Sequence, residues 1–367
     1  MLEKLLLTVI IGTLGGLLAK KIKLPAPFMT GSMLAVGLVS VFSGMMYVPR
    51  DYKTFAQIIS GAYIGQQVNK SDLKNFPSLV KPIILLLLLF TINSFLMGFT
   101  FSKFFHMDAM TALLSCLPGG IMDISLISID MGARSDIVAI MQLSRLVGML
   151  LILPYWTKVI LKHFQKKTEL FDEQEVDLTE EFLKEGEGML EDENRAAADK
   201  NASWQNNFLV ILVAGLGGLI GKWTGIPAGT LVFSLVFSLS LKLLKDTKPL
   251  SNWLRYLAQV CAGSIIGSSF TQKSLLQMET LLGPIVLLLL SYLVVNLLFT
   301  VIIYKRGIMD MQSALFASSP AGATDVSLMA GDLGGDMASI AGIQVSRILY
   351  TVIIMPNLVR LVVEFFE

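Results

Sequence analysis

The feature that most constrains this chain is an internal repeat: a shift of 202 positions superimposes its two halves without a gap. Pro25 then falls on Pro227, and Met107 falls on Met309. The match keeps one register over roughly 140 residues, which chance does not do. The fold must therefore be built from two copies of one unit.

Each copy is strongly apolar. Hydrophobic residues make up 54% of the chain, and its mean hydropathy is +0.67. Residues 79–100 and 280–303 are long enough for a bilayer, which takes about 20 residues. We expect apolar segments near 4–19, 26–48, 54–68, 79–104, 109–132 and 135–160, repeated near 207–221, 228–244, 256–270, 281–304, 311–334 and 337–362. The predicted fold class is an all-α polytopic membrane protein of two homologous repeats, each with five to six transmembrane segments.

The two repeats are separated by an acidic stretch. We place the first membrane repeat at 1–163, the linker at 164–206 and the second repeat at 207–367. The linker holds 13 of the 28 acidic residues. Such a composition is typical of a solvated connector.

The fifth segment of each repeat is interrupted at its centre. The first copy reads Leu117-Pro118-Gly119-Gly120, and the second reads Ser319-Pro320-Ala321-Gly322. Proline removes a backbone donor and glycine permits a sharp turn. Each arm of about 11–12 residues would make only about 17 Å of helix, half a membrane. The segment is either a re-entrant hairpin or a broken crossing helix.

Basic residues help to choose between these topologies. If the fifth segments do not cross, 16 flanking Lys and Arg residues lie in the cytoplasm and eight lie outside. If all segments cross, the split is 15 to nine. The positive-inside rule thus favours an odd number of crossings per half and inverted repeats, with a cytoplasmic linker in both schemes.

Four charged residues are expected at mid-membrane depth: Asp123 and Asp325 after each break, and Arg145 and Arg347 in each sixth segment. A charge there costs several kcal/mol unless it is paired or hydrated. One interpretation is a central binding site, with the aspartates binding a coupling H⁺ or Na⁺ and the arginines binding an anion. The other is a pair of structural ion pairs, Asp123–Arg145 and Asp325–Arg347. The predicted substrate- and ion-binding residues are Pro118, Gly119, Gly120, Asp123, Ser125, Gln142, Arg145, Pro320, Gly322, Asp325, Ser327, Gln344 and Arg347.

Small residues spaced four apart recur outside the broken segments. Gly61 and Gly65 have the counterparts Gly263 and Gly267 in the second half. This spacing indicates close helix packing in a membrane.

The stretch Leu-Pro-Gly-Gly-Ile-Met-Asp (117–123) is followed by Gly-Ala-Arg (132–134) and by Gln-Leu-Ser-Arg (142–145). Together with its counterpart in the second half, it resembles the AbrB-type membrane protein family over essentially the whole chain except the linker. Members of that family are named as regulators of gene expression or as ammonia monooxygenases. Its architecture is similar to that of inverted-repeat transporters of the proton-antiporter and bile-acid type, which is an analogy of fold.

Three functions compete. The favoured one is a multi-pass transporter in the bacterial inner membrane that moves a small anionic metabolite with H⁺ or Na⁺. The alternative is a membrane-embedded sensor or regulator that acts on gene expression indirectly. An enzyme is not expected, because oxidising ammonia would need a metal centre and the chain has only His106 and His163 as histidines.

The expected partners are the lipid bilayer and a small solute. We expect no cofactor beyond the coupling ion. A net charge of +1 predicts no nucleic-acid partner. Because paired-repeat transporters are often dimers, a homodimer is an expectation to be tested.

Overall fold

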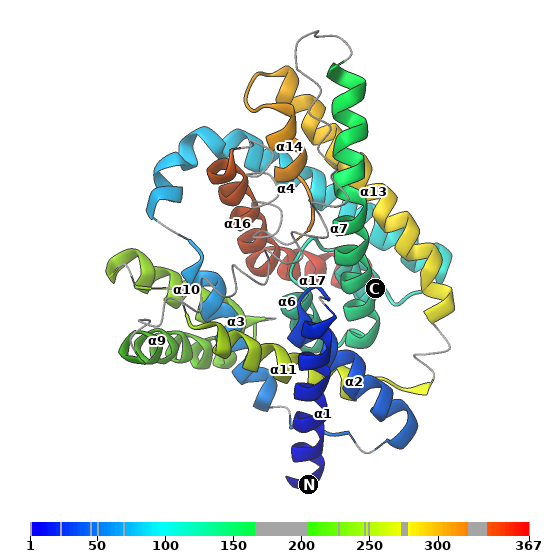
Figure 1. The fold of residues 1–367 in the computed structure, drawn as a ribbon, viewed down its shortest axis with the longest axis vertical. Helices are drawn as coiled ribbons and strands as arrows, with labels where there is room; N and C mark the ends of the chain where they lie inside the picture. Colours follow the sequence, from blue (N-terminus) through cyan, green and yellow to red (C-terminus); the bar gives the residue numbers. More distant parts are fainter. Residues whose placement is uncertain are drawn as a thin grey trace.

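The regular elements in the described part of the chain are all helices (Figure 1). The computed structural model describes residues 2–22, 24–44, 46–49, 51–68, 70–165, 204–226, 228–245, 247–248, 250–272, 278–321 and 336–366. Most of the predicted linker, and residues 322–335 of the second broken segment, lie outside these ranges.

Helix boundaries follow the predicted segments closely. The first repeat contributes α1 (Leu2–Lys21), α2 (Pro27–Ser43), α3 (Asp51–Gln66), α4 (Lys70–Phe105), α5 (Ala109–Ser115), α6 (Ile121–Asp130) and α7 (Ser135–Gln165). The second contributes α9 (Trp204–Trp223), α10 (Gly229–Lys245), α11 (Asn252–Ser268), α13 (Met278–Lys305), α14 (Met311–Ala317), α16 (Met337–Ile353) and α17 (Met355–Phe366). The predicted break in segment five is confirmed, because α5 ends at Ser115 and α6 begins at Ile121.

Four described helices are long and apolar enough to cross a bilayer. They cover Leu79–Phe105, Ser135–Lys162, Trp204–Trp223 and Glu279–Lys305. A fifth span results if Ser339–Ile353 and Met355–Phe365, which meet at a bend of 41°, count as one. The helices α2, α3, α10 and α11 have only 16 or 17 residues, about 25 Å at 1.5 Å per residue. They are therefore shorter than an average membrane span.

The broken segment turns back on itself. Asp108 caps α5 by accepting a bond from the Thr111 backbone N–H. The Thr111 hydroxyl then accepts a bond of 3.0 Å from the backbone N–H of Arg134, which follows α6. Both ends of the segment therefore lie side by side, so it is a re-entrant hairpin. We call residues 109–130 the first hairpin.

The second half repeats this geometry at the equivalent positions. Asp310 caps α14, and the Ser313 hydroxyl accepts a bond of 2.9 Å from the Asp336 backbone N–H. The chain that leaves Ser313 thus returns to it by residue 336. We call this second broken segment, of which residues 311–321 and 336 are described, the second hairpin.

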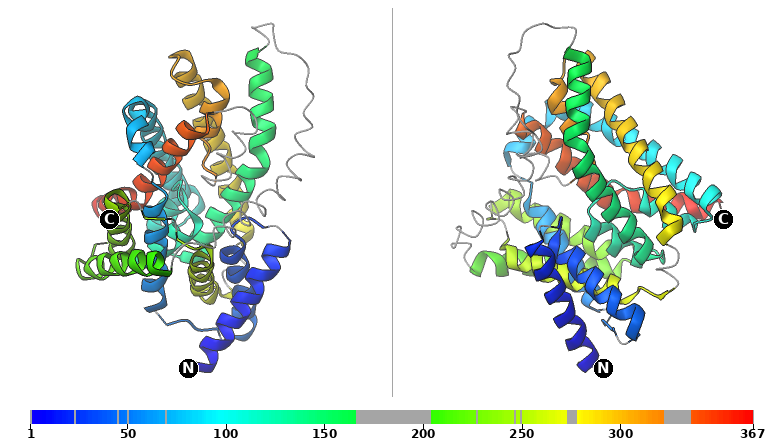
Figure 2. Two further views of the ribbon diagram at one scale, coloured as in Figure 1. Left: turned by 60° about the vertical axis from the view of Figure 1, so that its left-hand side comes forward. Right: turned by 45° about the vertical axis from the view of Figure 1, so that its right-hand side comes forward.

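Equivalent helices of the two repeats run in opposite directions. In Figure 1, α4 descends from the upper left while α13 rises from the lower right, and Figure 2 shows the same relation. Likewise α7 ascends and α16 descends. These are the directions of an inverted repeat, in which the two hairpins open towards opposite faces.

The helices fall into two bundles. The first, which we call the glycine bundle, holds α1, α2, α3, α9, α10 and α11. Here Gly61 of α3 lies against the Leu231 carbonyl of α10, and Gly263 of α11 lies against the Met29 carbonyl of α2. A side chain at either glycine would collide with backbone, so the predicted close packing is confirmed, and it joins one repeat to the other.

The remaining helices, which we call the hairpin bundle, are α4–α7, α13, α14, α16 and α17. The return arm α6 of the first hairpin packs against α3 and α11 of the glycine bundle as well as against α7. The hairpin therefore sits where the two bundles meet.

Candidate functional site

The tip of the first hairpin is held by a glutamine on α7. A helix that stops inside a membrane exposes carbonyl groups that water cannot reach. The Gln142 amide donates to the carbonyls of Leu114 (3.2 Å), Ser115 (3.4 Å) and Leu117 (3.0 Å). Gln142 is fully buried. Its role is to satisfy the end of α5.

Arg145, one turn further along α7, completes this cap. Its guanidinium donates to the carbonyls of Leu117 (3.2 Å) and Gly119 (2.5 Å), and the residue is only 3% exposed. A cation at the C-terminal end of a helix is electrostatically favourable. The ion pairs of the described residues do not include one between Asp123 and Arg145. For this half the ion-pair interpretation is wrong, because backbone carbonyls occupy the guanidinium.

The second hairpin is capped in the same way, 202 positions on. The Gln344 amide donates to the carbonyls of residues 316 (3.0 Å), 317 (3.1 Å) and 319 (3.0 Å). Arg347 donates to the carbonyls of Ser319 (2.6 Å) and Ala321 (3.0 Å). Every acceptor is the repeat counterpart of one in the first hairpin, so the cap belongs to the duplicated unit.

The two caps lie close together at the centre. Arg145 and Arg347 are within electrostatic range of each other, and Tyr292 of α13 is within range of both. The Tyr292 hydroxyl donates to the Cys116 carbonyl at 2.7 Å. Each arginine keeps a buried Nε–H without a hydrogen-bond acceptor. Two like charges, one from each repeat, are thus buried near one another.

The return arm carries a different set of contacts. Asp123 is 8% exposed and accepts a hydrogen bond from Ser60 of α3. Asp130, at the end of α6, pairs with Lys53 and accepts from the Gln57 amide at 2.5 Å. We call Lys53, Gln57, Ser60, Asp123 and Asp130 the polar seam. It joins the glycine bundle to the hairpin bundle.

Three seam residues were missed by the sequence reasoning. Lys53, Gln57 and Ser60 are spaced four and three apart, so they line one face of α3. A polar stripe in an otherwise apolar segment is a signal that could have found them. Arg255, the repeat counterpart of Lys53, is within electrostatic range of Asp123 and was also missed.

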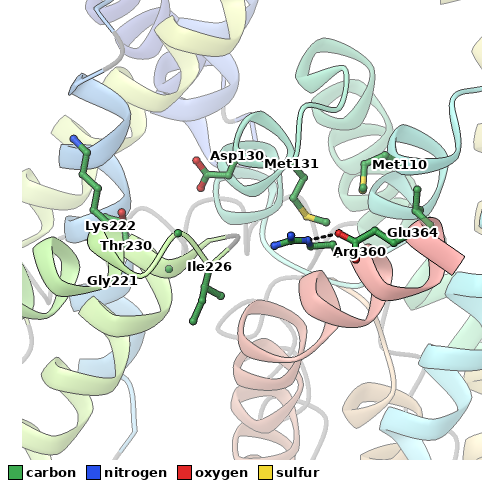
Figure 3. A pocket seen from close by; sticks show the side chains of 12 residues that line it. Met110, Asp130, Met131, Gly221, Lys222, Ile226, Thr230, Arg360 and Glu364 are labelled. Carbon is green, nitrogen blue, oxygen red and sulfur yellow. Dashed lines mark hydrogen bonds and ion pairs between the residues drawn. The ribbon is translucent and has the colours of Figure 1, made fainter. Parts of the chain in front are cut away.

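A cavity of about 470 Å³ opens at the outer end of the seam (Figure 3). Lys222, Ile226 and Thr230 line one side of it, from the region of α9 and α10. Asp130 and Arg360 line the other, and Arg360 pairs with Glu364 on α17. The cavity therefore lies between the two bundles, and Asp130 belongs both to it and to the seam.

The predicted site residues fall into three groups. Gln142, Arg145, Gln344 and Arg347 converge on the hairpin tips, and Pro118 and Pro320 are buried there. Asp123 lies in the seam, and Ser125 is buried with no partner for its hydroxyl. Gly322, Asp325 and Ser327 lie outside the described residues. Of the predicted site residues that the structure describes, none lines the cavity of Figure 3.

Comparison with known proteins agrees with this architecture. A family model described as "Transition state regulatory protein AbrB" matches two regions, 1–161 and 185–363. The second region begins within the predicted linker.

Two relatives align over most of the chain. One is "Putative regulator AbrB" of Escherichia coli (strain K12), 25% identical over 348 residues, or 93% of this chain and 91% of that protein. The other is "Uncharacterized protein YhjN" of Bacillus subtilis (strain 168), 21% identical over 321 residues, or 86% of this chain and 79% of that protein. Because the family model covers both repeats and most of their length, this chain belongs to the AbrB family.

Proposed function

We propose that this protein is an integral membrane secondary transporter that moves a small anionic metabolite together with H⁺ or Na⁺. Inverted repeats with helices interrupted near the midplane are the architecture of many secondary transporters. Irregular backbone at that depth survives only where protein covers it or where it lines a cavity. The presence of two such interrupted segments in one chain therefore favours a function in which they form a binding site.

The observation that carries the proposal is the pair of buried guanidinium groups. Arg145 and Arg347 are each 3% exposed, and the ion pairs of the described chain assign neither of them a carboxylate. The carbonyls at the hairpin tips offset part of this charge. The unused Nε–H groups remain as donors for a further acceptor. An anion that binds there would relieve the repulsion between the two cations.

The polar seam supports movement between the bundles. Its contacts are hydrogen bonds and one ion pair, whereas the glycine bundle is joined internally by backbone-to-backbone approach. The boundary also holds apolar contacts, because Met33 of α2 and Ile266 of α11 belong to the same buried cluster as residues of α4, α7 and α13. The polar contacts of the seam are the part of this boundary that can be exchanged for water. The cavity beside Asp130 gives a solute a route to the boundary between the bundles.

A thermal-shift screen of the purified protein against small carboxylates, phosphate and other metabolites tests the proposal. A ligand present at about 100 times its Kd stabilises a protein by about 2.7 kcal/mol. We expect at least one anion to raise the unfolding temperature of the wild type. The same anion should then show counterflow in proteoliposomes.

The matched control compares two arginine-to-lysine variants. Arg347→Lys keeps a charge but loses the planar fork, so the shift caused by the anion should disappear. Arg306→Lys changes an exposed guanidinium that follows α13 and does not line the cavity of Figure 3, and should keep the shift. Equal responses of both variants, or no counterflow by any stabilising anion, would contradict an anion site between the hairpins.

A second candidate function follows from the names of the family model and of its Escherichia coli relative, which describe regulators. A membrane-embedded regulator would act through a partner that touches the acidic linker. Deleting residues 170–200 separates the two functions. A regulator should lose its effect on gene expression, while a transporter should keep counterflow.

A further inference from the structure

The coupling ion of the proposed transporter can be narrowed from the surroundings of Asp123. Its carboxylate accepts from Ser60, and Arg255 of α11 is the cation within electrostatic range. On α3, Lys53 is already paired with Asp130. On α7, Arg145 is bound to carbonyls. The arm α5 has no charged residue.

A sodium ion would need several oxygen ligands. In broken-helix transporters, unwound carbonyl groups usually supply them. In the first hairpin the carbonyls of residues 114, 115, 116, 117 and 119 all accept bonds from side chains. Those donors are Gln142, Arg145, Ser94 and Tyr292, and one of them carries a positive charge. Five backbone oxygen atoms at the tip, those of residues 114–117 and 119, are therefore already engaged as hydrogen-bond acceptors.

A proton needs only the carboxylate and a route from water. Asp130 lies seven residues after Asp123, so both occupy one face of α6, about 10 Å apart. The side chain of Asp130 is 20% exposed and lines the cavity of Figure 3. The polar seam thus leads from that cavity to Asp123.

We infer that the coupling ion is a proton and that Asp123 carries it, reached from the cavity along the polar seam. This assignment rests on the proposed transport function, for which it specifies the coupling ion. In the transfer, a hydronium ion from the aqueous side gives its proton to the carboxylate: one O–H bond of hydronium breaks, the O–H bond of the acid forms, and a water molecule is left. The neutral acid then loses its longer-range electrostatic attraction to Arg255 of α11, a helix of the glycine bundle.

Infrared spectroscopy of the full-length protein in lipid bilayers tests this without any solute. Acidifying the sample from mildly alkaline buffer should produce a carboxylic acid band in the wild type. Asp123→Asn should lose that band, and Asp136→Asn, which alters a carboxylate paired with Arg134 at the hairpin mouth, should keep it. Exchanging choline chloride for sodium chloride should leave the band unchanged.

Two results would overturn the inference. One is a band in the wild type that sodium chloride suppresses and choline chloride does not, because sodium would then compete for the site. The other is an identical spectrum for the wild type and Asp123→Asn. If Asp123→Asn does not fold, Ser60→Ala must shift the frequency of the band, since the Ser60 hydroxyl bonds to that carboxyl group. The experiment measures protonation and not uptake, so its result can be interpreted even if the transport proposal fails.

Discussion

The two arms of the first hairpin are held by different parts of the molecule. The outgoing arm α5 ends in a cap built by α7, with further bonds from Ser94 and Tyr292 to the Cys116 carbonyl. All of these donors belong to the hairpin bundle. The polar bonds of the return arm α6 go instead to α3 of the glycine bundle, through Asp123 and Asp130.

This difference assigns separate tasks to the arms. The outgoing arm is fixed by many donors to buried carbonyls, and losing one leaves an unsatisfied group in an apolar interior. The return arm is joined to its neighbour by a few side-chain contacts that open towards the cavity. We therefore expect the contacts of the outgoing arm to contribute most to the free energy of unfolding. The contacts of the return arm are the ones that can break and re-form when the two bundles move.

The largest effect is expected from Arg145→Ala. The variant removes the guanidinium donors to the Leu117 and Gly119 carbonyls, of which Leu117 keeps its bond from Gln142, and should destabilise the protein by about 3 kcal/mol or more. The thermal unfolding midpoint of the detergent-solubilised protein measures this. Arg145→Lys should recover only part of the loss, because an ammonium group lacks the guanidinium fork. An unfolding midpoint that is unchanged in Arg145→Ala would contradict the claim that the outgoing arm is fixed by its buried hydrogen bonds.

Gln142→Leu should follow, with a loss of about 2 kcal/mol, because three carbonyls at the end of α5 each lose a side-chain donor. The equivalent variant Gln344→Leu should lose about the same amount, because the equivalent three carbonyls each lose the same kind of donor. Denaturation of both variants side by side provides the measurement. A clear inequality between them would show that the two hairpin caps are not equivalent.

Ser60→Ala tests the return arm and should cost about 1.5 kcal/mol, the low end for a hydrogen bond to a charged group. Alanine is the natural residue at the matching position of α11, Ala262, so the helix itself should tolerate it. The same unfolding assay applies. A loss as large as that of Arg145→Ala would mean that both arms are equally fixed.

Lys53→Gln should have the smallest effect, about 0.5–1 kcal/mol. Its ammonium group and the Asp130 carboxylate are 22% and 20% exposed, and partly exposed ion pairs contribute little. Added salt should screen the ion pair and lower the stability of the wild type towards that of Lys53→Gln. Unfolding midpoints measured over a series of salt concentrations would detect this. Insensitivity of the wild type to salt would argue against an ion pair open to water.

The sequence predicts the fold and the break well, but it does not predict the partners of the central charges. Proline and glycine at 118–120 interrupt a helix by local geometry, so the position of the hairpin tip follows from the residues themselves. The depth of Arg145 also follows from its place in an apolar run. Its acceptors are backbone carbonyls, and no side-chain pattern marks them.

The polar seam could not be predicted from the sequence for a related reason. Ser60 and Asp123 lie 63 positions apart, and no spacing within either helix shows that they meet. Arg255, which acts on Asp123, comes from the other repeat altogether. Contacts of this kind arise because each repeat packs its short helices against those of its twin, which is a property of the assembled bundles.

The central claim is that two re-entrant hairpins open towards opposite faces of the membrane and meet at their tips. Single cysteines placed by Lys103→Cys, Ala133→Cys, Arg306→Cys and Asp336→Cys test it, in a chain whose buried Cys116 and Cys261 are replaced by alanine. With an impermeant thiol reagent on oriented vesicles, we predict labelling of positions 103 and 133 from one face and of 306 and 336 from the other. Labelling of 103 and 133 from opposite faces would show that the first broken segment crosses the membrane, and would contradict the account.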